Sequence, residues 1–191
     1  MALTPSQMLP LGTVAPDFSL PDTAGRIVTL SELDARGYLV AFLCNHCPYV
    51  KHLNAALAAF GRECADKGVA MIAISSNDVD RYPQDSPARM AEEAARHGYP
   101  FPYLYDESQA VARAYHAACT PDFFLFDGAR RLVYRGCFDD SSPGNGRPIT
   151  GAPLRAAVDA VVAGAPVSAD QTPAMGCNIK WKPGNEPPYF G

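Results

Sequence analysis

The chain has 191 residues, of which 48% are hydrophobic and 19% are charged, and its formal net charge is −4. This length suits a single domain, and the ordinary apolar fraction argues against disorder. The acidic balance, without any lysine or arginine cluster, argues against nucleic acid as a partner. No apolar run approaches the ~18 residues that a membrane helix needs, and residues 1–20 lack the pattern of a signal peptide. We therefore expect a cytoplasmic protein with no membrane partner.

The pattern of apolar residues predicts the elements in chain order. The first 22 residues contain four prolines and little periodicity, which predicts an extended arm. A short strand at 26–30 is followed by one helical turn that begins near Ser31. Continuous apolar runs predict buried strands at 38–44 and 69–75, with an amphipathic helix at 50–64 between them. Farther on, the sequence predicts helices at 87–97, 107–117 and 153–163, a short strand at 103–105, and a hairpin of strands 123–126 and 132–135.

The order of these elements predicts the fold class. Strands and helices alternate in the first half, which predicts parallel crossovers, and the late hairpin predicts an antiparallel edge. The expected fold is a three-layer α/β/α sandwich with a mixed central sheet, formed by residues 1–164, of which 1–22 are the arm. Residues 165–191 are rich in proline and glycine, so we predict a C-terminal tail that packs on the domain, with Trp181 as its anchor.

Six cysteines in a chain expected in the cytoplasm indicate redox chemistry, a metal site or simple burial, because structural disulfides are rare there. Two of them form the motif Cys44-Asn45-His46-Cys47 between a buried strand and a helix. A helix N-terminus favours a thiolate over a thiol. We predict that Cys44, at the exposed start of the motif, attacks a disulfide and that the less accessible Cys47 resolves the mixed disulfide. A protonated His46 would favour either thiolate and raise the reduction potential above thioredoxin's ~ −270 mV.

The same spacing of cysteines also occurs in zinc sites and in structural pairs. A metal site needs two further ligands, and none of the candidates lies in a second CxxC motif. Those candidates are His52, Cys119, Cys137 and Cys177. A protein that binds or delivers a soft ion such as copper(I), held by Cys44, Cys47 and a histidine, is therefore an open alternative. A reduced, buried pair without chemistry is another.

A second motif begins at Cys119 and continues with Thr120 and Pro121, directly before a predicted strand. A CxxC motif between the first core strand and its helix, followed later by Thr-Pro before a hairpin, resembles the thioredoxin fold. In that family the proline is cis and faces the CxxC motif, and the residue before it offers backbone groups to the substrate. The resemblance implies that Thr120 and Pro121 line the groove beside Cys44 and Cys47, with Cys119 nearby.

The resemblance extends along nearly the whole chain. Residues 12–20 (GTVAPDFSL) are similar to the G-x-x-A-P-D-F opening of the redoxin and alkyl-hydroperoxide-reductase group. Residues 44–51 (CNHCPYVK), 120–127 (TPDFFLFD) and 176–182 (GCNIKWK) resemble a peroxiredoxin-like subgroup of the AhpC/TSA type that carries CxxC. This resemblance implies a thiol-disulfide oxidoreductase whose partner is a dithiol or disulfide protein or a small thiol. It implies no organic cofactor and no metal, because the cysteine pair itself carries the electrons.

A peroxiredoxin-like thiol peroxidase is the alternative enzyme, with Cys47 attacking peroxide and Cys44 or Cys177 resolving the product. Peroxiredoxins use a Pro-x-x-x-Thr/Ser-x-x-Cys frame, in which the hydroxyl and an arginine hold the peroxide against the thiolate. Here Cys44 would occupy the Thr position and Val40 the Pro position. Neither side chain can replace the residue expected there.

The remaining residues of interest have supporting or structural interpretations. Asn45, between the cysteines, is a supporting residue of the motif. Cys64 is expected to pack in the core, because it lies on the apolar face of the predicted helix, and Cys137 is expected to be structural. Cys119 and Cys177 are either accessory redox thiols or small buried side chains. In the tail, Cys177 is a candidate resolving partner for Cys44.

Overall fold

The computed structural model describes residues 3–190; residues 1–2 of the predicted arm and residue 191 of the predicted tail lie outside them. Its central sheet has five strands in the spatial order β6-β5-β4-β8-β9. These strands span Tyr103–Tyr105, Val69–Ser75, Gly37–Phe42, Asp122–Asp127 and Leu132–Gly136. β4 is parallel to β5 and antiparallel to β8, so the sheet is mixed, as predicted.

Strand β4 lies at the centre of the sheet, and all six of its residues are buried. Alternate side chains of a strand point to opposite faces. Leu39 and Ala41 pack in the core on one face, and Val40 and Phe42 pack in the core on the other. A strand covered on both faces has a continuous apolar sequence, which is why the run at 38–44 predicted it.

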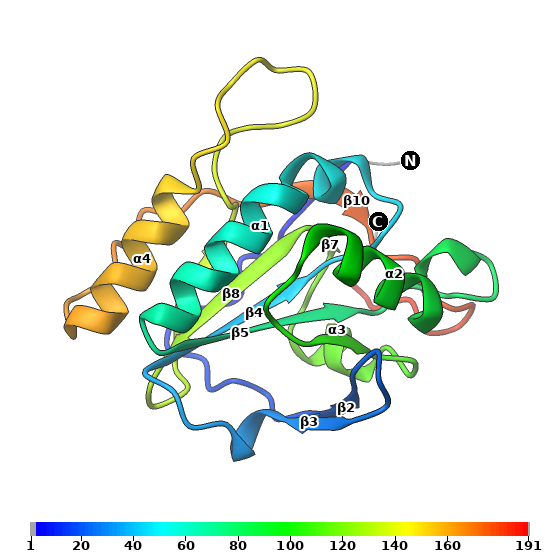
Figure 1. The fold of residues 1–191 in the computed structure, drawn as a ribbon, viewed down its shortest axis with the longest axis horizontal. Helices are drawn as coiled ribbons and strands as arrows, with labels where there is room; N and C mark the ends of the chain where they lie inside the picture. Colours follow the sequence, from blue (N-terminus) through cyan, green and yellow to red (C-terminus); the bar gives the residue numbers. More distant parts are fainter. Residues whose placement is uncertain (1–2, 191) are drawn as a thin grey trace.

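Helices cover both faces of the sheet (Figure 1). On one face lie α1 (Pro48–Asp66), α2 (Pro87–His97) and α4 (Ala152–Ala163), whose buried residues share a single core. The other face carries the short α3 (Ala110–Ala114) and the β2–β3 hairpin, which consists of Ser19–Pro21 and Ile27–Thr29. Within residues 3–190, no helix has the length and apolarity to cross a membrane.

The arm and the tail, which the sequence predicts separately, pair with each other. β1 (Leu3–Pro5), β10 (Met175–Asn178) and β7 (Cys119–Thr120) form a second, antiparallel sheet with β10 in the middle. Trp181 is buried in the core on the α3 face, as expected of an anchor. The tail thus reaches the segment that contains Thr120. β10 is short and lacks an alternating pattern, so the sequence did not predict it.

Three local predictions differ from the structure. The helix predicted at 107–117 is only α3, which begins at Ala110 because Gln109 has a left-handed φ of 61°. The buried side-chain amide of Gln109 donates to the carbonyls of Ser76 and Lys180. The helical turn near Ser31 is a 3-10 helix, η1, at Leu30–Glu32. The strand predicted at 38–44 ends at 42, so the CxxC motif lies in a loop.

Candidate active site

The CxxC motif occupies the loop between β4 and α1. The helix begins at Pro48, so Cys47 is the residue directly before it. Proline suits this first position, where its missing amide breaks no helical hydrogen bond. The prediction that Cys44 is exposed was wrong: both cysteines are thiols, with exposed fractions of 1% for Cys44 and 0% for Cys47.

Both sulfurs contact Thr120, which is far away in the sequence. The Cys44 sulfur lies 3.3 Å from the Thr120 hydroxyl oxygen, and the Cys47 sulfur lies 3.1 Å from the Thr120 carbonyl oxygen. The peptide bond between Thr120 and Pro121 is cis. The fold therefore brings the two sequence motifs together with the arrangement that the thioredoxin resemblance implies.

The two thiols have different electrostatic surroundings. The pKa of Cys47 is lowered to about 4, chiefly by a hydrogen bond from the Cys44 thiol, while burial opposes this shift and the thiol and amide of Cys177 add to it. The pKa of Cys44 is raised well above its ordinary value by the same hydrogen bond, by burial and by the charge of Asp85. The Thr120 carbonyl oxygen favours a thiol at Cys47, but the donors around this sulfur outnumber it. We infer that the reduced pair carries its negative charge on Cys47.

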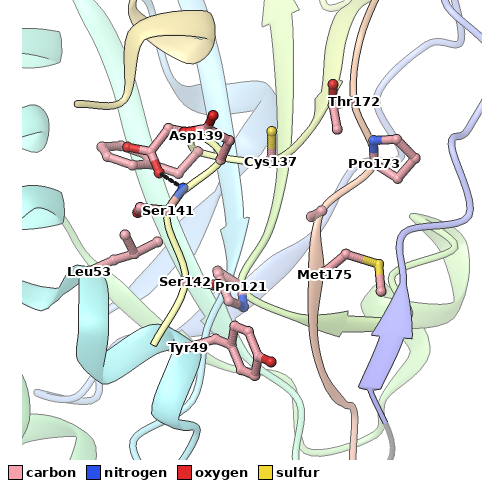
Figure 2. A pocket seen from close by; sticks show the side chains of 13 residues that line it. Tyr49, Leu53, Pro121, Cys137, Asp139, Ser141, Ser142, Thr172, Pro173 and Met175 are labelled. Atoms are coloured by element: carbon pink, nitrogen blue, oxygen red, sulfur yellow. Dashed lines mark hydrogen bonds between the residues drawn. The ribbon is translucent and has the colours of Figure 1, made fainter. Parts of the chain in front are cut away.

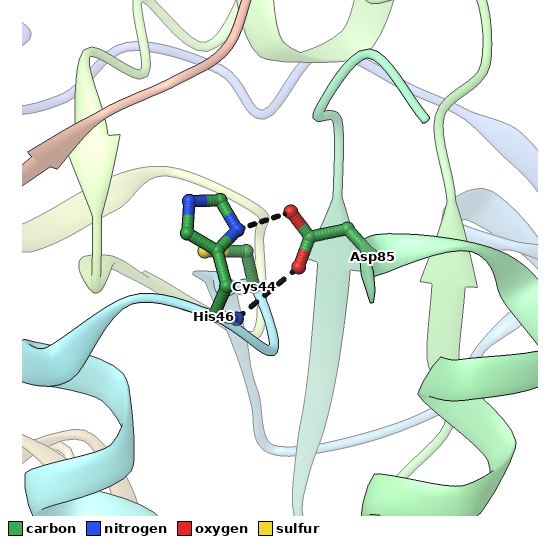
Figure 3. A group of neighbouring side chains, drawn as sticks. All are labelled: Cys44, His46 and Asp85. Carbon is green, nitrogen blue, oxygen red and sulfur yellow. Dashed lines mark hydrogen bonds and ion pairs between the residues drawn. The ribbon is translucent and has the colours of Figure 1, made fainter. Parts of the chain in front are cut away.

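Asp85 fixes the backbone of the motif from the short 3-10 helix η2 (Pro83–Asp85). Its Oδ1 accepts hydrogen bonds from the amides of Asn45 and His46, at 2.8 and 3.2 Å. Its Oδ2 accepts from Nδ1 of His46 at 2.6 Å (Figure 3). The same oxygen accepts from Nδ2 of Asn77 at 2.8 Å. Burial alone would raise the pKa of Asp85, but the hydrogen bonds from His46, Asn77 and Asn45 lower it. The buried carboxylate therefore holds the loop in place.

The side chains between the two cysteines are held by further contacts. The Asn45 amide donates to the carbonyl of Gln84 at 2.9 Å, and the Tyr103 hydroxyl donates to the Asn45 side-chain oxygen at 3.1 Å. The ring of His46 stacks on Tyr82, with 5.5 Å between centroids. Nδ1 of His46 faces Asp85, so the effect of His46 on the thiols operates beside a carboxylate. Its role as a pKa modulator stays a prediction.

Asp85 and Asn77 were not predicted from the sequence, although one signal points to the segment that contains them. β4 and β5 are parallel neighbours, so their carboxyl ends lie at the same edge of the sheet. The motif follows β4, and the polar segment that contains Asn77 and Asp85 follows β5. Parallel pairing therefore predicts that this polar segment meets the motif, but the sequence does not show which of its several aspartates does so.

The other cysteines lie at different depths around the site. Cys177 is buried in β10 and stands opposite Thr120 in the β10–β7 pairing. Cys119 is buried, with its sulfur 3.6 Å from the Pro121 carbonyl oxygen. Cys64 packs in the core on α1, as predicted. Both candidate accessory thiols are thus near the CxxC motif, and a redox role for either stays a prediction.

The structure brings together a different set of possible metal ligands from the one that the sequence predicted. The ligand atoms of Cys44, His46 and Asp85 lie within 4.8 Å of one another, whereas the prediction used Cys44, Cys47 and a histidine. Both oxygens of Asp85 already accept two hydrogen bonds each, one of them from the His46 nitrogen that faces it. A metal would have to displace these donors, so the geometry favours the hydrogen-bonded network.

A cleft of about 200 Å³ opens beside Pro121 (Figure 2). Tyr49 and Leu53 of α1 form one wall, and Met175 of β10 lies across from them. The loop after β9, which includes Cys137, lines a further side. Through Pro121 the cleft borders the segment whose Thr120 contacts both cysteine sulfurs.

Comparison with known proteins places this architecture in a family. Residues 11–135, more than half of the chain, match the family described as AhpC/TSA. The chain belongs to the AhpC/TSA family. This AhpC/TSA protein is 53% identical to a hypothetical protein of Sinorhizobium meliloti 1021, whose crystal structure superposes with a TM-score of 0.93 over 95% of this chain and 100% of the other. An uncharacterized conserved protein from Geobacillus kaustophilus is 50% identical, with a TM-score of 0.94 over 96% and 98% of the two chains.

The names of more distant relatives describe thiol-disulfide exchange. The AhpC/TSA chain is 27% identical to the thiol-disulfide oxidoreductase ResA of Halalkalibacterium halodurans, and the match covers 64% of this chain and 65% of that protein. The match therefore spans less than two thirds of the relative's length. A thiol:disulfide interchange protein of the thioredoxin family from Chlorobium tepidum TLS superposes with a TM-score of 0.62 at 16% identity, over 79% and 97% of the chains. This likeness confirms the predicted thioredoxin-like fold.

Proposed function

We propose that this AhpC/TSA protein is a thiol-disulfide oxidoreductase whose redox centre is the pair Cys44 and Cys47. The observation that carries the proposal is the contact of both sulfurs with Thr120, one through its hydroxyl and one through its carbonyl. Two thiols that share one proton, beside a cis-proline turn and an apolar cleft, have the chemistry for disulfide exchange. The name of the ResA relative agrees with this activity.

The order of events that we propose begins with a proton transfer within the pair, because the reduced pair holds its proton on Cys44. Cys44 attacks a substrate disulfide and passes its proton to Cys47, with which it shares a hydrogen bond. The first substrate sulfur leaves as a thiolate. This thiolate takes the proton from Cys47, and Cys47 then attacks the Cys44 sulfur and releases the second substrate sulfur as a thiolate. The substrate loses its disulfide bond and the Cys44–Cys47 bond forms, so two electrons pass to the substrate. Cys47 is the deprotonated member of the reduced pair, so it is the group available to accept this proton in the first step.

The partner would be a dithiol or disulfide protein or a small thiol. Both sulfurs are buried, and we propose that a partner approaches through the surface around Pro121, where the cleft lies. Tyr49, Leu53 and Met175 give this surface an apolar character. A cytoplasmic location stays a prediction from the sequence.

The test is reduction of a protein disulfide, such as those of insulin, with dithiothreitol as electron source. Cys44→Ser and Cys47→Ser are each expected to reduce the rate to that of dithiothreitol alone. Cys64→Ser is the matched control, because Cys64 is a buried thiol of α1 that lies in the core away from Thr120. A Cys44→Ser variant as active as the wild type would refute the proposal. Cys47→Ser is also expected to trap a stable mixed disulfide through Cys44.

One observation favours the peroxidase alternative, namely the lowered pKa of Cys47. A thiolate at this position could attack peroxide, with Cys44 as the resolving thiol. Its complete burial and its contact with the Thr120 carbonyl oppose this reaction. Rapid consumption of hydrogen peroxide by the wild type, lost in Cys47→Ser but retained in Cys64→Ser, would support the alternative.

A further inference from the structure

A third thiol stands next to the CxxC pair, on a segment far away in the sequence. Cys177 of β10 pairs with Thr120 of β7, and the Thr120 carbonyl is the group that the Cys47 sulfur contacts at 3.1 Å. Cys47 and Cys177 are both buried and belong to the same core cluster between α1 and the sheet. Cys47 is therefore near both the second thiol of the motif and the thiol of the tail.

The residue before Cys177 explains how β10 comes so close. A β-carbon at Gly176 would lie 2.0 Å from the Thr120 carbonyl oxygen, a distance that no side chain can occupy. Glycine at this position lets the tail strand lie directly against Thr120. The close approach and the cysteine that follows it place the third thiol beside Cys47.

The electrostatics of the three thiols agree with this placement. Burial, followed by the hydrogen bond that Cys177 donates to the Cys47 sulfur, raises the pKa of Cys177 to about 12. The same contact helps to lower the pKa of Cys47. In the reduced protein Cys177 thus holds its proton toward Cys47, as Cys44 does.

We propose that Cys177 is a second disulfide partner of Cys47, so that the disulfide formed at Cys44–Cys47 moves to Cys47–Cys177. The inference rests on the proposed function, because the Cys44–Cys47 disulfide starts the exchange. The sulfur of Cys177 attacks that of Cys47, the Cys44–Cys47 bond breaks, and the Cys47–Cys177 bond forms. The proton of Cys177 passes to Cys44, and no electrons are gained or lost.

The exchange would have two consequences for the site. Cys44 returns to the thiol form, and the disulfide now joins Cys47, directly before α1, to Cys177 of β10. The same bond ties the C-terminal strand covalently to the start of the helix. Cys177 would then be a catalytic residue of the tail, and the pairing of β10 with β7 would hold it in position.

Tryptic peptides separate the two disulfides without ambiguity. Cleavage places Cys44 and Cys47 together in the fragment 37–51, Cys177 in the fragment 156–180 and Cys119 in the fragment 114–130. A Cys44–Cys47 bond leaves 37–51 as a single peptide, whereas a Cys47–Cys177 bond joins it to 156–180. The folded protein is oxidised with diamide, quenched with acid, alkylated with N-ethylmaleimide and analysed by mass spectrometry.

The informative variant is Cys44→Ala, in which Cys47 has no partner in the motif. We expect more than half of this variant to carry the 37–51/156–180 link, and we expect Cys44→Ala/Cys177→Ala to lack it. In the partly oxidised wild type we expect the same link with the alkyl group on Cys44. This second readout does not depend on whether a variant folds. The absence of the link from both proteins would overturn the proposal, as would equal linkage of Cys47 to the 114–130 fragment.

The outcome is distinguishable from that of the proposed function. If the wild type forms the link but does not reduce insulin, the proposed oxidoreductase activity fails and the exchange between thiols stands. If it reduces insulin but never forms the link, the activity stands and Cys177 is a structural residue.

Discussion

Two buried carboxyl groups flank the site, and their surroundings give them opposite charge preferences. Asp85 accepts four hydrogen bonds from the motif and from Asn77, and its pKa is lowered despite burial. Asp122, directly after Pro121 at the start of β8, accepts a long hydrogen bond of 3.5 Å from the Ala118 amide. Within residues 3–190 its Oδ1 has no hydrogen-bond partner. Burial therefore raises the pKa of Asp122 to about 7.

The difference shows that burial alone does not decide the charge of a carboxyl group. Both side chains are fully buried, and desolvation disfavours the charged form of each. Several donors reverse this effect at Asp85, and too few reach Asp122. The charged Asp85 opposes a thiolate at Cys44, which is one reason why the charge of the cysteine pair falls on Cys47.

The largest expected effect is the loss of stability on replacing Asp85 with alanine. The change leaves the donors of Asn45, His46 and Asn77 buried without their acceptor. Because each unsatisfied buried group costs ~1–3 kcal/mol, we expect the free energy of unfolding to fall by about 3–5 kcal/mol. Urea unfolding at pH 7 measures this loss.

The charge of Asp85 is tested by pH. Because the pKa of Asp85 is lower in the folded protein, its contribution to stability is present above the ordinary value near 3.8 and is lost as the pH falls through the folded value. Asp85→Asn is expected to weaken the acid dependence of stability below pH 4. An Asp85→Ala variant within about 1 kcal/mol of the wild type would show that the loop is held by other contacts.

Asp122 should behave in the opposite way, and Asp122→Asn tests this. Between the ordinary pKa of 3.8 and the folded value of about 7, the folded state binds more protons than the unfolded state. Stability of the wild type relative to the variant should therefore be greatest below pH 4 and fall until about pH 7. The full range corresponds to at most about 4 kcal/mol. Urea unfolding of both proteins from pH 4 to 8 gives the difference, and a constant difference would contradict the raised pKa.

The contrast between these two acids also shows what the sequence could predict. The CxxC motif and the Thr120-Pro121 pair are local patterns that resemble those of the thioredoxin fold. Because the two patterns lie side by side in that fold, their contact could be predicted. Asp85 lies in a polar loop with several other acids, and only the donors that converge on it in three dimensions distinguish it. The contact of Cys177 with Cys47 depends on a strand of four residues that has no periodic pattern. Pairings of such short segments are decided by tertiary packing.

The smallest expected effect comes from His46→Gln, which removes one donor and the one ionisable partner of Asp85. The other three hydrogen bonds to Asp85 remain, so we expect a loss of about 1 kcal/mol in the free energy of unfolding.

Without the hydrogen bond from His46, the negative charge of Asp85 acts on Cys44 with less compensation, which disfavours the reduced, thiolate-bearing pair. The reduction potential should therefore become more negative by about 30 mV, a tenfold change in the equilibrium constant. Equilibration with glutathione buffers measures this potential, with Tyr82→Phe as the control, because it keeps the ring that stacks on His46. An unchanged reduction potential in His46→Gln would show that His46 does not alter the effect of the Asp85 charge on Cys44. The difference between the two carboxyl groups would then depend only on their hydrogen bonds to backbone and amide donors.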